Sequence, residues 1–351
     1  MSKKHFSWLL ASTLVVTILI LLMPGKTGKE SEFAVRSLVP GLDSRVNDVT
    51  RVRITKGGNV PVATLVRGEE AWTVEEAKSY PADWARLKKL LFALSQAQVI
   101  ELKTSNPDYY DRLGVKDISD PSSSAVLVEI GEGDQATRLL LGAPAQGREG
   151  QYVRFPDQEQ ALLINRPVEV SAQAADWLLR DVVDLAEAEV VDVTITHPDG
   201  DAIHLSRVSA DVPDFTLDKI PKGREVESSW AVNALAGSLA AVLLEDVTRA
   251  DQLDWSKSTH VRVLTADGIE ARAEVVTVDG KSWLKLEALP YPEQAAEPAQ
   301  GEAQDNTAAE RLKRVEAINT RVRGWAYSIP EFKSELINKR KENLLKPLAK
   351  K

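Results

Sequence analysis

The chain of 351 residues contains no cysteine. This absence excludes disulfide bonds, thiolate metal sites, cysteine nucleophiles and the lipid-modified cysteine of a bacterial lipoprotein. Positive charge is also in deficit, because 44 Lys and Arg residues face 52 Asp and Glu residues, which gives a net charge of -8. This balance argues against a nucleic-acid-binding surface. The remaining composition, 43% hydrophobic and 27% charged, is that of a folded globular protein with room for two domains.

Sequence motifs of common enzymes are absent as well. The chain has no G-x-S-x-G, H-E-x-x-H, phosphate-loop or dinucleotide-binding pattern, and its four histidines are scattered. Ser282 and Lys285 formally match S-x-x-K, but the surrounding residues alternate as a strand, and an odd separation sends the two side chains to opposite faces. We therefore predict a protein that is not an enzyme, with no catalytic residue and no bound cofactor.

The densest group of possible metal ligands is THPDGDAIH, residues 196–204. Alternation of apolar residues places His197 on the core-directed face of a strand and His204 on the opposite face of the returning strand. Pro-Asp-Gly between them is typical turn chemistry. The pattern predicts a β-hairpin, and no metal site is assigned to it.

The N-terminus contains an uncharged, mostly apolar run over residues 6–25, FSWLLASTLVVTILILLMPG. About 20 such residues are enough to cross the hydrocarbon core of a bilayer. A cleaved secretory signal and a buried core helix are the alternatives, but the run is long for a signal and lacks a clear small-residue cleavage site. We expect residues 1–25 to be an anchor in the bacterial inner membrane, with a single pass. Residues 26–48 are then a juxtamembrane segment, and the bulk of the chain is extracytoplasmic, in the periplasm.

A pattern of strands and one helix occurs twice along the chain. VTRVRITKGGNVPVATLVR near the start of residues 49–166 matches VVDVTITHPDGDAIHLSRV near the start of residues 189–289, and a helix follows each hairpin. The sequence predicts an α+β fold of two repeated β-β-β-α-β-β-β units, in which a helix covers each antiparallel sheet.

Three further segments complete the predicted organisation. Residues 167–188 are expected to form a connecting helix between the repeats. Residues 290–307 are rich in Pro, Ala, Glu and Gln and are expected to be a flexible linker. Residues 308–351 read as a helical segment with a basic tail.

Tryptophan is the most informative aromatic residue, with eight copies. Trp84, Trp177 and Trp230 lie at predicted helix starts on apolar faces, so we expect them in the core. Trp255 and Trp283, by a turn and in a short strand, are candidate outward-facing residues that bind a partner or a glycan.

Several short segments occur together in one order along the chain. They are Trp72, PADW at 81–84, YDRLG at 110–114, WLLRD at 177–181 and GWAYSIPEFK at 324–333. In these segments the sequence resembles the bacterial family of domain of unknown function 4340. The resemblance implies a membrane-anchored extracytoplasmic protein, often encoded beside ABC transporter components of the gliding-motility type. The family has no established catalytic residues to carry over, and Phe215 stands where the second repeat would be expected to have tryptophan.

The functional expectation is a non-enzymatic, membrane-anchored accessory or binding subunit. Its expected partners are the membrane, through the anchor, and an ABC transporter permease or related envelope protein. Two alternatives remain: an envelope-processing hydrolase whose carboxylates are brought together by the fold, and a spacer that binds envelope polymer.

Overall fold

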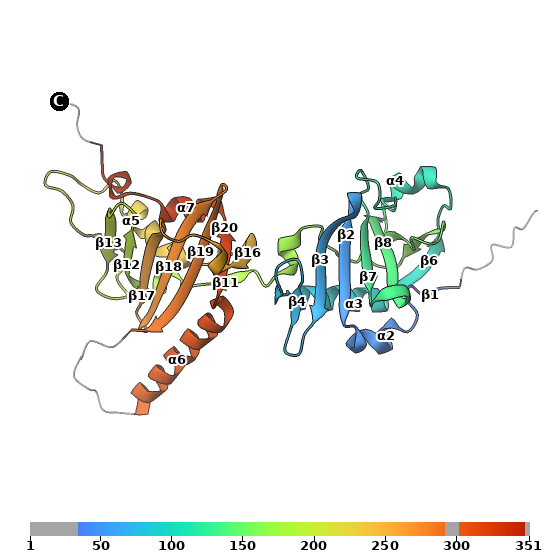
Figure 1. Ribbon diagram of the computed structural model, residues 1–351, viewed down its shortest axis with the longest axis horizontal. Helices are drawn as coiled ribbons and strands as arrows, with labels where there is room; N and C mark the ends of the chain where they lie inside the picture. The colour runs from blue at the N-terminus through green and yellow to red at the C-terminus, as the bar shows by residue number, and fades with distance from the viewer. Residues whose placement is uncertain (1–33, 292–301, 348–351) are drawn as a thin grey trace, which may run out of the picture.

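The computed structural model describes residues 34–291 and 302–347, which form two lobes side by side (Figure 1). Each lobe is built around one large antiparallel sheet. The predicted anchor, residues 1–25, and the first part of the juxtamembrane segment lie outside the described residues. Among the helices of the described ranges, none combines the length and apolar character needed to cross a bilayer.

The first lobe contains a ten-stranded sheet in the order β1-β6-β10-β9-β8-β7-β2-β3-β4-β5. Its strands are β1 (Arg36–Ser37), β2 (Arg51–Lys56), β3 (Val60–Arg67), β4 (Trp72–Val74), β5 (Tyr80–Pro81), β6 (Gln98–Leu102), β7 (Val126–Ile130), β8 (Thr137–Pro144), β9 (Gln151–Arg154) and β10 (Ala161–Ile164). Its helices are α2 (Leu42–Arg45), α3 (Trp84–Gln96) and α4 (Tyr110–Leu113).

The second lobe contains an eight-stranded sheet in the order β14-β13-β12-β17-β18-β19-β20-β16. Its strands are β12 (Val190–Thr196), β13 (Ala202–Ser206), β14 (Thr216–Leu217), β16 (Asp246–Arg249), β17 (Thr259–Thr265), β18 (Ile269–Val278), β19 (Lys281–Pro290) and β20 (Trp325–Ile329). Its helices are α5 (Ser229–Ala236), α6 (Glu302–Val322) and α7 (Glu331–Ile337), and a small sheet pairs β11 (Asp181–Val183) with β15 (Val242–Leu243).

The two large sheets have corresponding strand orders. Read from β4, the first sheet runs β4-β3-β2-β7-β8-β9-β10-β6, and the second runs β14-β13-β12-β17-β18-β19-β20-β16. In both lobes a helix, α3 or α5, lies in the sequence between the first three strands and the strand at the far side. The correspondence assigns each strand of the second sheet a counterpart in the first.

The predicted α+β class is wrong, because the chain is mostly antiparallel sheet, with 36% strand and 27% helix. The predicted repeat of six strands and one helix is also wrong, since the common strand order includes β6 and β10 in the first lobe and β16 and β20 in the second. β6 directly follows α3, and its first residue, Gln98, continues the helical spacing of Leu87, Leu91 and Leu94. β20 is separated from β19 by α6, which interrupts the repeat in the sequence.

Helix α3 covers one face of the first sheet with a stripe of leucines. The side chain of Asp83 caps its N-terminus by accepting a hydrogen bond from the Arg86 backbone N–H at 3.0 Å. The buried residues of the helix recur at helical spacing, and each fully buried leucine contributes about 1.5–3 kcal/mol relative to an exposed one. They include Leu87, Leu90, Leu91 and Leu94.

Two of the three tryptophans expected in the core are exposed. Trp84 is the first residue of α3 and Trp230 the second residue of α5, and their side chains are 49% and 74% exposed. The buried stripe starts at the fourth residue after the cap in α3, Leu87, and at the third in α5, Ala231, so both tryptophans precede it and face away from the sheet. Trp177 is fully buried and donates its indole N–H to the Ser171 carbonyl at 3.0 Å.

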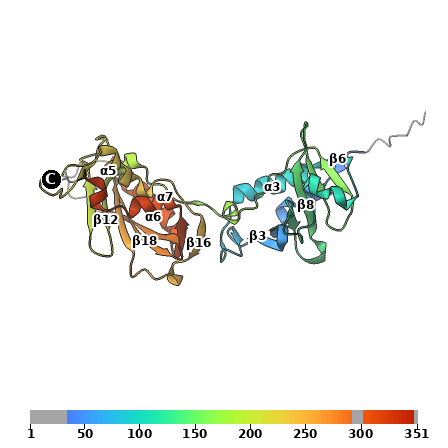
Figure 2. The same cartoon turned by 90° about the horizontal axis from the view of Figure 1, so that it is seen from above.

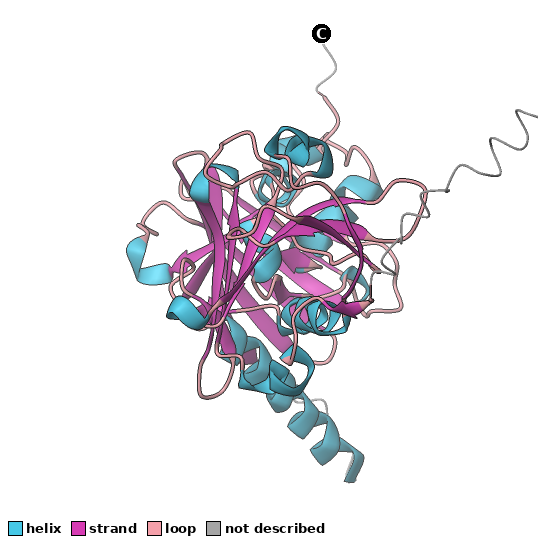
Figure 3. Ribbon diagram, turned by 90° about the vertical axis from the view of Figure 1, so that its right-hand side faces the viewer, coloured by secondary structure: helices cyan, strands magenta, loops and turns pink. Residues whose placement is uncertain are grey.

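The segments between and after the repeats also differ from expectation. Residues 167–188 contain two 3-10 turns and strand β11 in place of the expected helix. Helix α6 begins at Glu302, inside the range expected to be a linker, and extends beyond the sheets (Figure 3). Near its end, Asn319 exchanges two hydrogen bonds with the Ala288 backbone at 2.9 and 2.8 Å, so this amide occupies the place of a strand partner at the edge of β19.

Candidate binding grooves on the open sheet faces

Each large sheet has one face covered by helices and one face largely open. In the second sheet the alternating residues Val193, Ile195, Val261 and Val263 point into the main core, and the residues between them are mostly polar. Figure 2 shows α3 and α5 toward one side of the molecule and the strands β3, β16 and β18, from both sheets, toward the other. The two open faces are therefore on the same side of the molecule.

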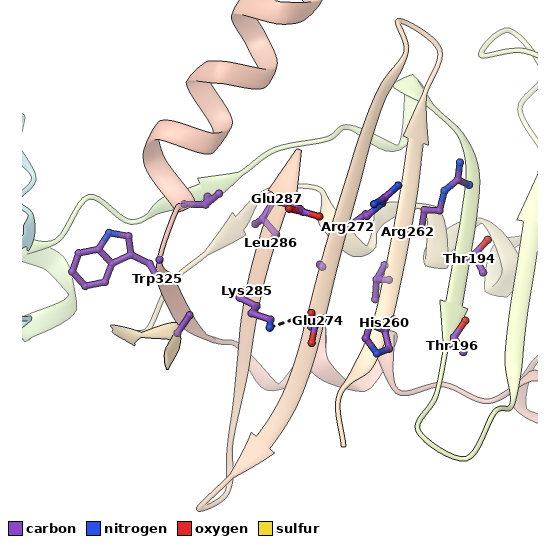
Figure 4. A pocket seen from close by; sticks show the side chains of 15 residues that line it. Thr194, Thr196, His260, Arg262, Arg272, Glu274, Lys285, Leu286, Glu287 and Trp325 are labelled. Carbon is purple, nitrogen blue, oxygen red and sulfur yellow. Dashed lines mark ion pairs between the residues drawn. The ribbon is translucent and has the colours of Figure 1, made fainter. Parts of the chain in front are cut away.

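The open face of the second sheet contains a groove of about 490 Å³ (Figure 4). Its floor consists of side chains from four neighbouring strands, and Trp325 lies at the end nearest the first lobe. The strand register places the polar side chains in two rows. The rows are Thr194, Arg262, Arg272 and Glu287, and Thr196, His260, Glu274 and Lys285.

A chain of ion pairs fixes the charges in the first row. Arg262 donates to Asp192 at 2.9 Å and to Glu270 at 3.3 Å, while Arg272 donates from Nε to Glu270 at 2.6 Å. Burial alone would raise the pKa of Glu270, but hydrogen bonds from Arg272 and Arg262 outweigh it, and the pKa lies below its usual range. Glu270 is therefore a fixed negative charge that holds two guanidinium groups in place. In the second row, Lys285 pairs with Glu274 at 3.1 Å.

His204 continues this network across the sheet. Its Nε2 lies 2.6 Å from Asp192 and its Nδ1 lies 2.7 Å from Asp218. Burial alone would lower the pKa of His204, but the hydrogen bonds to the two carboxylates outweigh it and raise the pKa above its usual value. The ring is thus favoured as a cation between two anions.

The two histidines of THPDGDAIH lie on opposite faces of the hairpin. His197 is buried, with Nε2 3.0 Å from the Lys339 carbonyl, whereas His204 is on the open face. Within the described ranges, no group of three or more His, Cys, Asp or Glu side chains is arranged to hold a metal ion.

The first sheet has a groove of about 440 Å³ at the corresponding place on its open face. The paired strand registers relate five lining positions of this groove to five of the second groove. The pairs are Arg53 with Thr194, Thr55 with Thr196, Leu127 with His260, Glu129 with Arg262, and Arg138 with Arg272. The charges at these positions differ between the lobes, but a groove is present at the corresponding place in both sheets.

The tryptophans proposed for partner binding lie on the open face but are largely covered. Trp283 is 8% exposed and packs with Val276 and Ala326 in a small apolar cluster. Trp255 packs against this cluster, donates its indole N–H to the Ala250 carbonyl at 2.7 Å and lies under the Lys285 ammonium, 4.5 Å from the ring centroid. Both tryptophans belong to the apolar cluster that includes Ala250 and Leu253 of the loop after β16. Their role in partner binding stays a prediction.

Backbone hydrogen bonds join the first lobe to the connector beside the second groove. The N–H of Asp83 donates to the Trp177 carbonyl at 2.9 Å, and the N–H of Leu179 donates to the Pro81 carbonyl at 3.0 Å. The Tyr80 hydroxyl donates to the Leu179 carbonyl at 3.0 Å. The connector is thereby fixed to β5 and to the start of α3.

Aromatic side chains complete the junction between the lobes. Tyr80 of the first lobe is fully buried, and its ring meets the ring of Trp325 edge-on, with centroids 5.0 Å apart and an interplanar angle of 89°. It also contacts Tyr327 edge-on at 6.0 Å. The Arg249 guanidinium lies 4.2 Å from the Trp325 ring centroid. The PADW, WLLRD and GWAYSIPEFK segments therefore meet at one place, where the second groove ends.

A family model described as domain of unknown function (DUF4340) matches residues 72–262. Neither a curated protein nor a solved structure gives a significant match. The family match begins at β4 and ends within β17, so it includes the connector and much of the junction, and it covers more than half of the 351 residues. The chain therefore belongs to the family of domain of unknown function DUF4340.

Proposed function

We propose that this protein is a non-enzymatic binding and accessory subunit, anchored in the bacterial inner membrane by residues 1–25 and exposed to the periplasm. In this proposal it works with an ABC transporter of the gliding-motility type and uses its two grooves to hold the extracytoplasmic partner or cargo of that transporter. The observation that carries the proposal is the duplication of the groove at five related strand positions.

The grooves have the properties of a preorganised binding surface. Arg262 and Arg272 are held by ion pairs to Glu270, so binding need not order them. Charges fixed in this way favour selection among partners and fast association more than raw affinity. Two such grooves on one side of the molecule allow an extended partner to engage both lobes at once.

The hydrolase alternative is less well supported by the same residues. A glycosidase-type mechanism needs two carboxyl groups, one of which has a raised pKa and acts as the acid. Glu270, the buried carboxylate beneath the second groove, has a lowered pKa because of its two arginines, the opposite of what a general acid requires.

Binding of an envelope polymer is a second candidate function. The placement of both grooves on the same side favours it, because an extended polymer can contact both grooves at once. Co-sedimentation of the chain with purified peptidoglycan tests this candidate, and recovery of all the protein in the supernatant would remove it.

The principal test is affinity purification of the tagged full chain from native membranes, followed by mass spectrometry. The proposal expects a transporter permease and its ATPase among the recovered proteins at levels well above those captured by an unrelated single-pass membrane protein with the same tag. Equal recovery in both samples would contradict the association with a transporter.

A further inference from the structure

The outer face of helix α3 presents aromatic and basic side chains together. Trp84, Lys88 and Phe92 are spaced by four residues and therefore lie along one stripe of the helix. Trp84 is 49% exposed and Phe92 is 62% exposed, and all the other residues toward this side are polar or small. The Trp84 ring is held in place by stacking on Trp72, with centroids 6.1 Å apart.

The charge of this face differs in sign from that of the whole chain. It carries the cations Lys88 and Lys89, with Arg86 on the flank of the helix, whereas the chain has a net charge of -8. Two carboxylates adjoin it: Asp83, 4.0 Å from Arg86, and Glu169, 2.5 Å from Lys89. Lys88, between the two aromatic residues, forms no ion pair within residues 34–291 and 302–347. The face is therefore suited to a negatively charged surface.

The position of α3 relative to the proposed anchor brings this face close to the bilayer. The chain enters the first lobe at β1, and the Leu38 N–H donates to the Ala97 carbonyl at 2.9 Å, directly after the last turn of α3. Residues 26–33 separate the proposed anchor from the first described residue, and a fully extended segment of that length spans at most about 28 Å. The Phe92 end of α3 is thus the part of the helix nearest to the point of entry.

We propose that the outer face of α3 rests on the anionic phospholipid headgroups of the membrane that holds the anchor. Phe92 and Trp84 lie in the interfacial layer, and Lys88 and Lys89 contact phosphate groups. Because α3 and the open sheet faces are on opposite sides of the molecule, both grooves then face away from the bilayer, toward the periplasm (Figure 2). The inference rests on the anchoring that forms part of the proposed function.

Helix α7 of the second lobe provides a matched comparison. Phe332 is 64% exposed, close to the value for Phe92, but it is flanked by the exposed carboxylates Glu331 and Glu335. An anionic surface repels this environment and attracts that of Phe92. Phe92 and Phe332 are exposed to nearly the same extent but have neighbours of opposite charge. If exposed aromatic residues simply preferred interfaces, both would enter the membrane; contact with anionic lipid predicts that only Phe92 does.

The absence of cysteine allows a direct test with single-cysteine variants of the full chain. Phe92→Cys and, as control, Phe332→Cys are each labelled with an environment-sensitive fluorophore and reconstituted in vesicles of phosphatidylcholine with or without phosphatidylglycerol. We expect blue-shifted emission and quenching by a nitroxide-labelled lipid only for the label at position 92, and only in anionic vesicles. Lys88→Glu with Lys89→Glu is expected to lower the ratio of docked to undocked protein more than about tenfold.

The other outcomes overturn the inference in distinguishable ways. If the chain floats with the vesicles but the label at position 92 stays in water, anchoring holds and the contact of α3 with lipid does not. If the chain does not associate with vesicles, anchoring fails and the inference fails with it. If the label is shielded in native membranes but exposed in anionic vesicles, a protein covers α3 and the lipid proposal is wrong.

Discussion

Replacing Tyr80 by alanine removes the main side-chain contact across the junction between the lobes. Tyr80 is fully buried, its hydroxyl bonds the Leu179 carbonyl at 3.0 Å, and its ring meets Trp325 edge-on. Truncating a fully buried aromatic residue to alanine costs about 3–5 kcal/mol, because the cavity closes only in part. Tyr80→Phe, which removes only the hydrogen bond, is expected to cost about 1 kcal/mol.

A double-mutant cycle isolates the part of this cost that comes from the junction itself. Tyr80→Ala and Trp325→Ala are measured singly and together by urea unfolding of the full chain in detergent, followed by far-UV circular dichroism. We expect a coupling energy of about 0.5–1.5 kcal/mol, the usual value for an edge-to-face aromatic pair.

The control cycle pairs Tyr80→Ala with Trp283→Ala. Trp283 belongs to a separate apolar cluster that does not include Tyr80, so the two effects should add within about 0.5 kcal/mol. Additive effects in the Tyr80 and Trp325 cycle would refute the assignment of these rings to a fixed junction, because the lobes would then be free of mutual stabilisation at this point.

Three further predictions concern the open face and its edge. Glu270→Gln removes the charge held between two partly exposed arginines and should lower the free energy of unfolding by about 1–3 kcal/mol. Glu287→Gln, a control in the neighbouring groove, should change it by less than about 0.5 kcal/mol. Equal effects of the two substitutions would contradict the ion-pair network around Glu270. Because the folded-state pKa of His204 is raised, its contribution to stability is complete below its unfolded-state pKa and is lost as the pH rises through the folded-state pKa. The melting temperature of the wild type should thus fall more than that of His204→Gln between about pH 6 and pH 8.5, and parallel curves would refute the assignment. Asn319→Ala should cost about 1–3 kcal/mol and speed hydrogen exchange at the Ala288 amide, and an unchanged exchange rate would show that the edge of β19 is satisfied in another way.

Strands with one buried and one open face were predictable from the sequence. The pattern over residues 269–278 predicts a strand, and β18 has the same bounds, Ile269–Val278. In such a strand apolar and polar residues alternate, and this period of two residues is easy to recognise in the sequence. The predictions were less accurate where this pattern was short or was joined to another one, as in β6 directly after α3 and in the four-residue β16.

The orientation of the side chains on the two repeat helices was not predicted correctly from the sequence. Aligning the two repeat helices by their tryptophans shifts the register by one residue, whereas aligning Asp83 with Ser228, the two N-caps, brings Leu87 onto Val232 in the buried stripe. Counting from each cap places Trp84 and Trp230 in the exposed first turn of their helices, so neither faces the core. The cap side chains were visible in the sequence, but both tryptophans were placed in the core by their apolar character alone.

The grooves were not predicted, because their residues come from strands that are far apart in the chain. Arg262 and Arg272 become neighbours only through the pairing of β17 with β18, and Glu287 joins them through β19. Comparing the two repeats did not reveal the grooves either, because the residue types at related positions differ. Glu129 and Arg262, for example, occupy the same position and have opposite charge. The available signal was the run of polar residues between apolar ones on each strand, which also describes an ordinary solvated face.

Site-specific cross-linking from the second groove tests the central claim most directly. A photoreactive group is attached to the full chain at Glu287→Cys, inside the groove, or at Arg112→Cys, an exposed control position on α4 outside both grooves, and native membranes are irradiated. The account predicts that the groove position yields a cross-linked product containing a transporter component or its cargo and that the control position does not. No product from the groove, or the same products from both positions, would contradict the assignment of the groove as the binding surface.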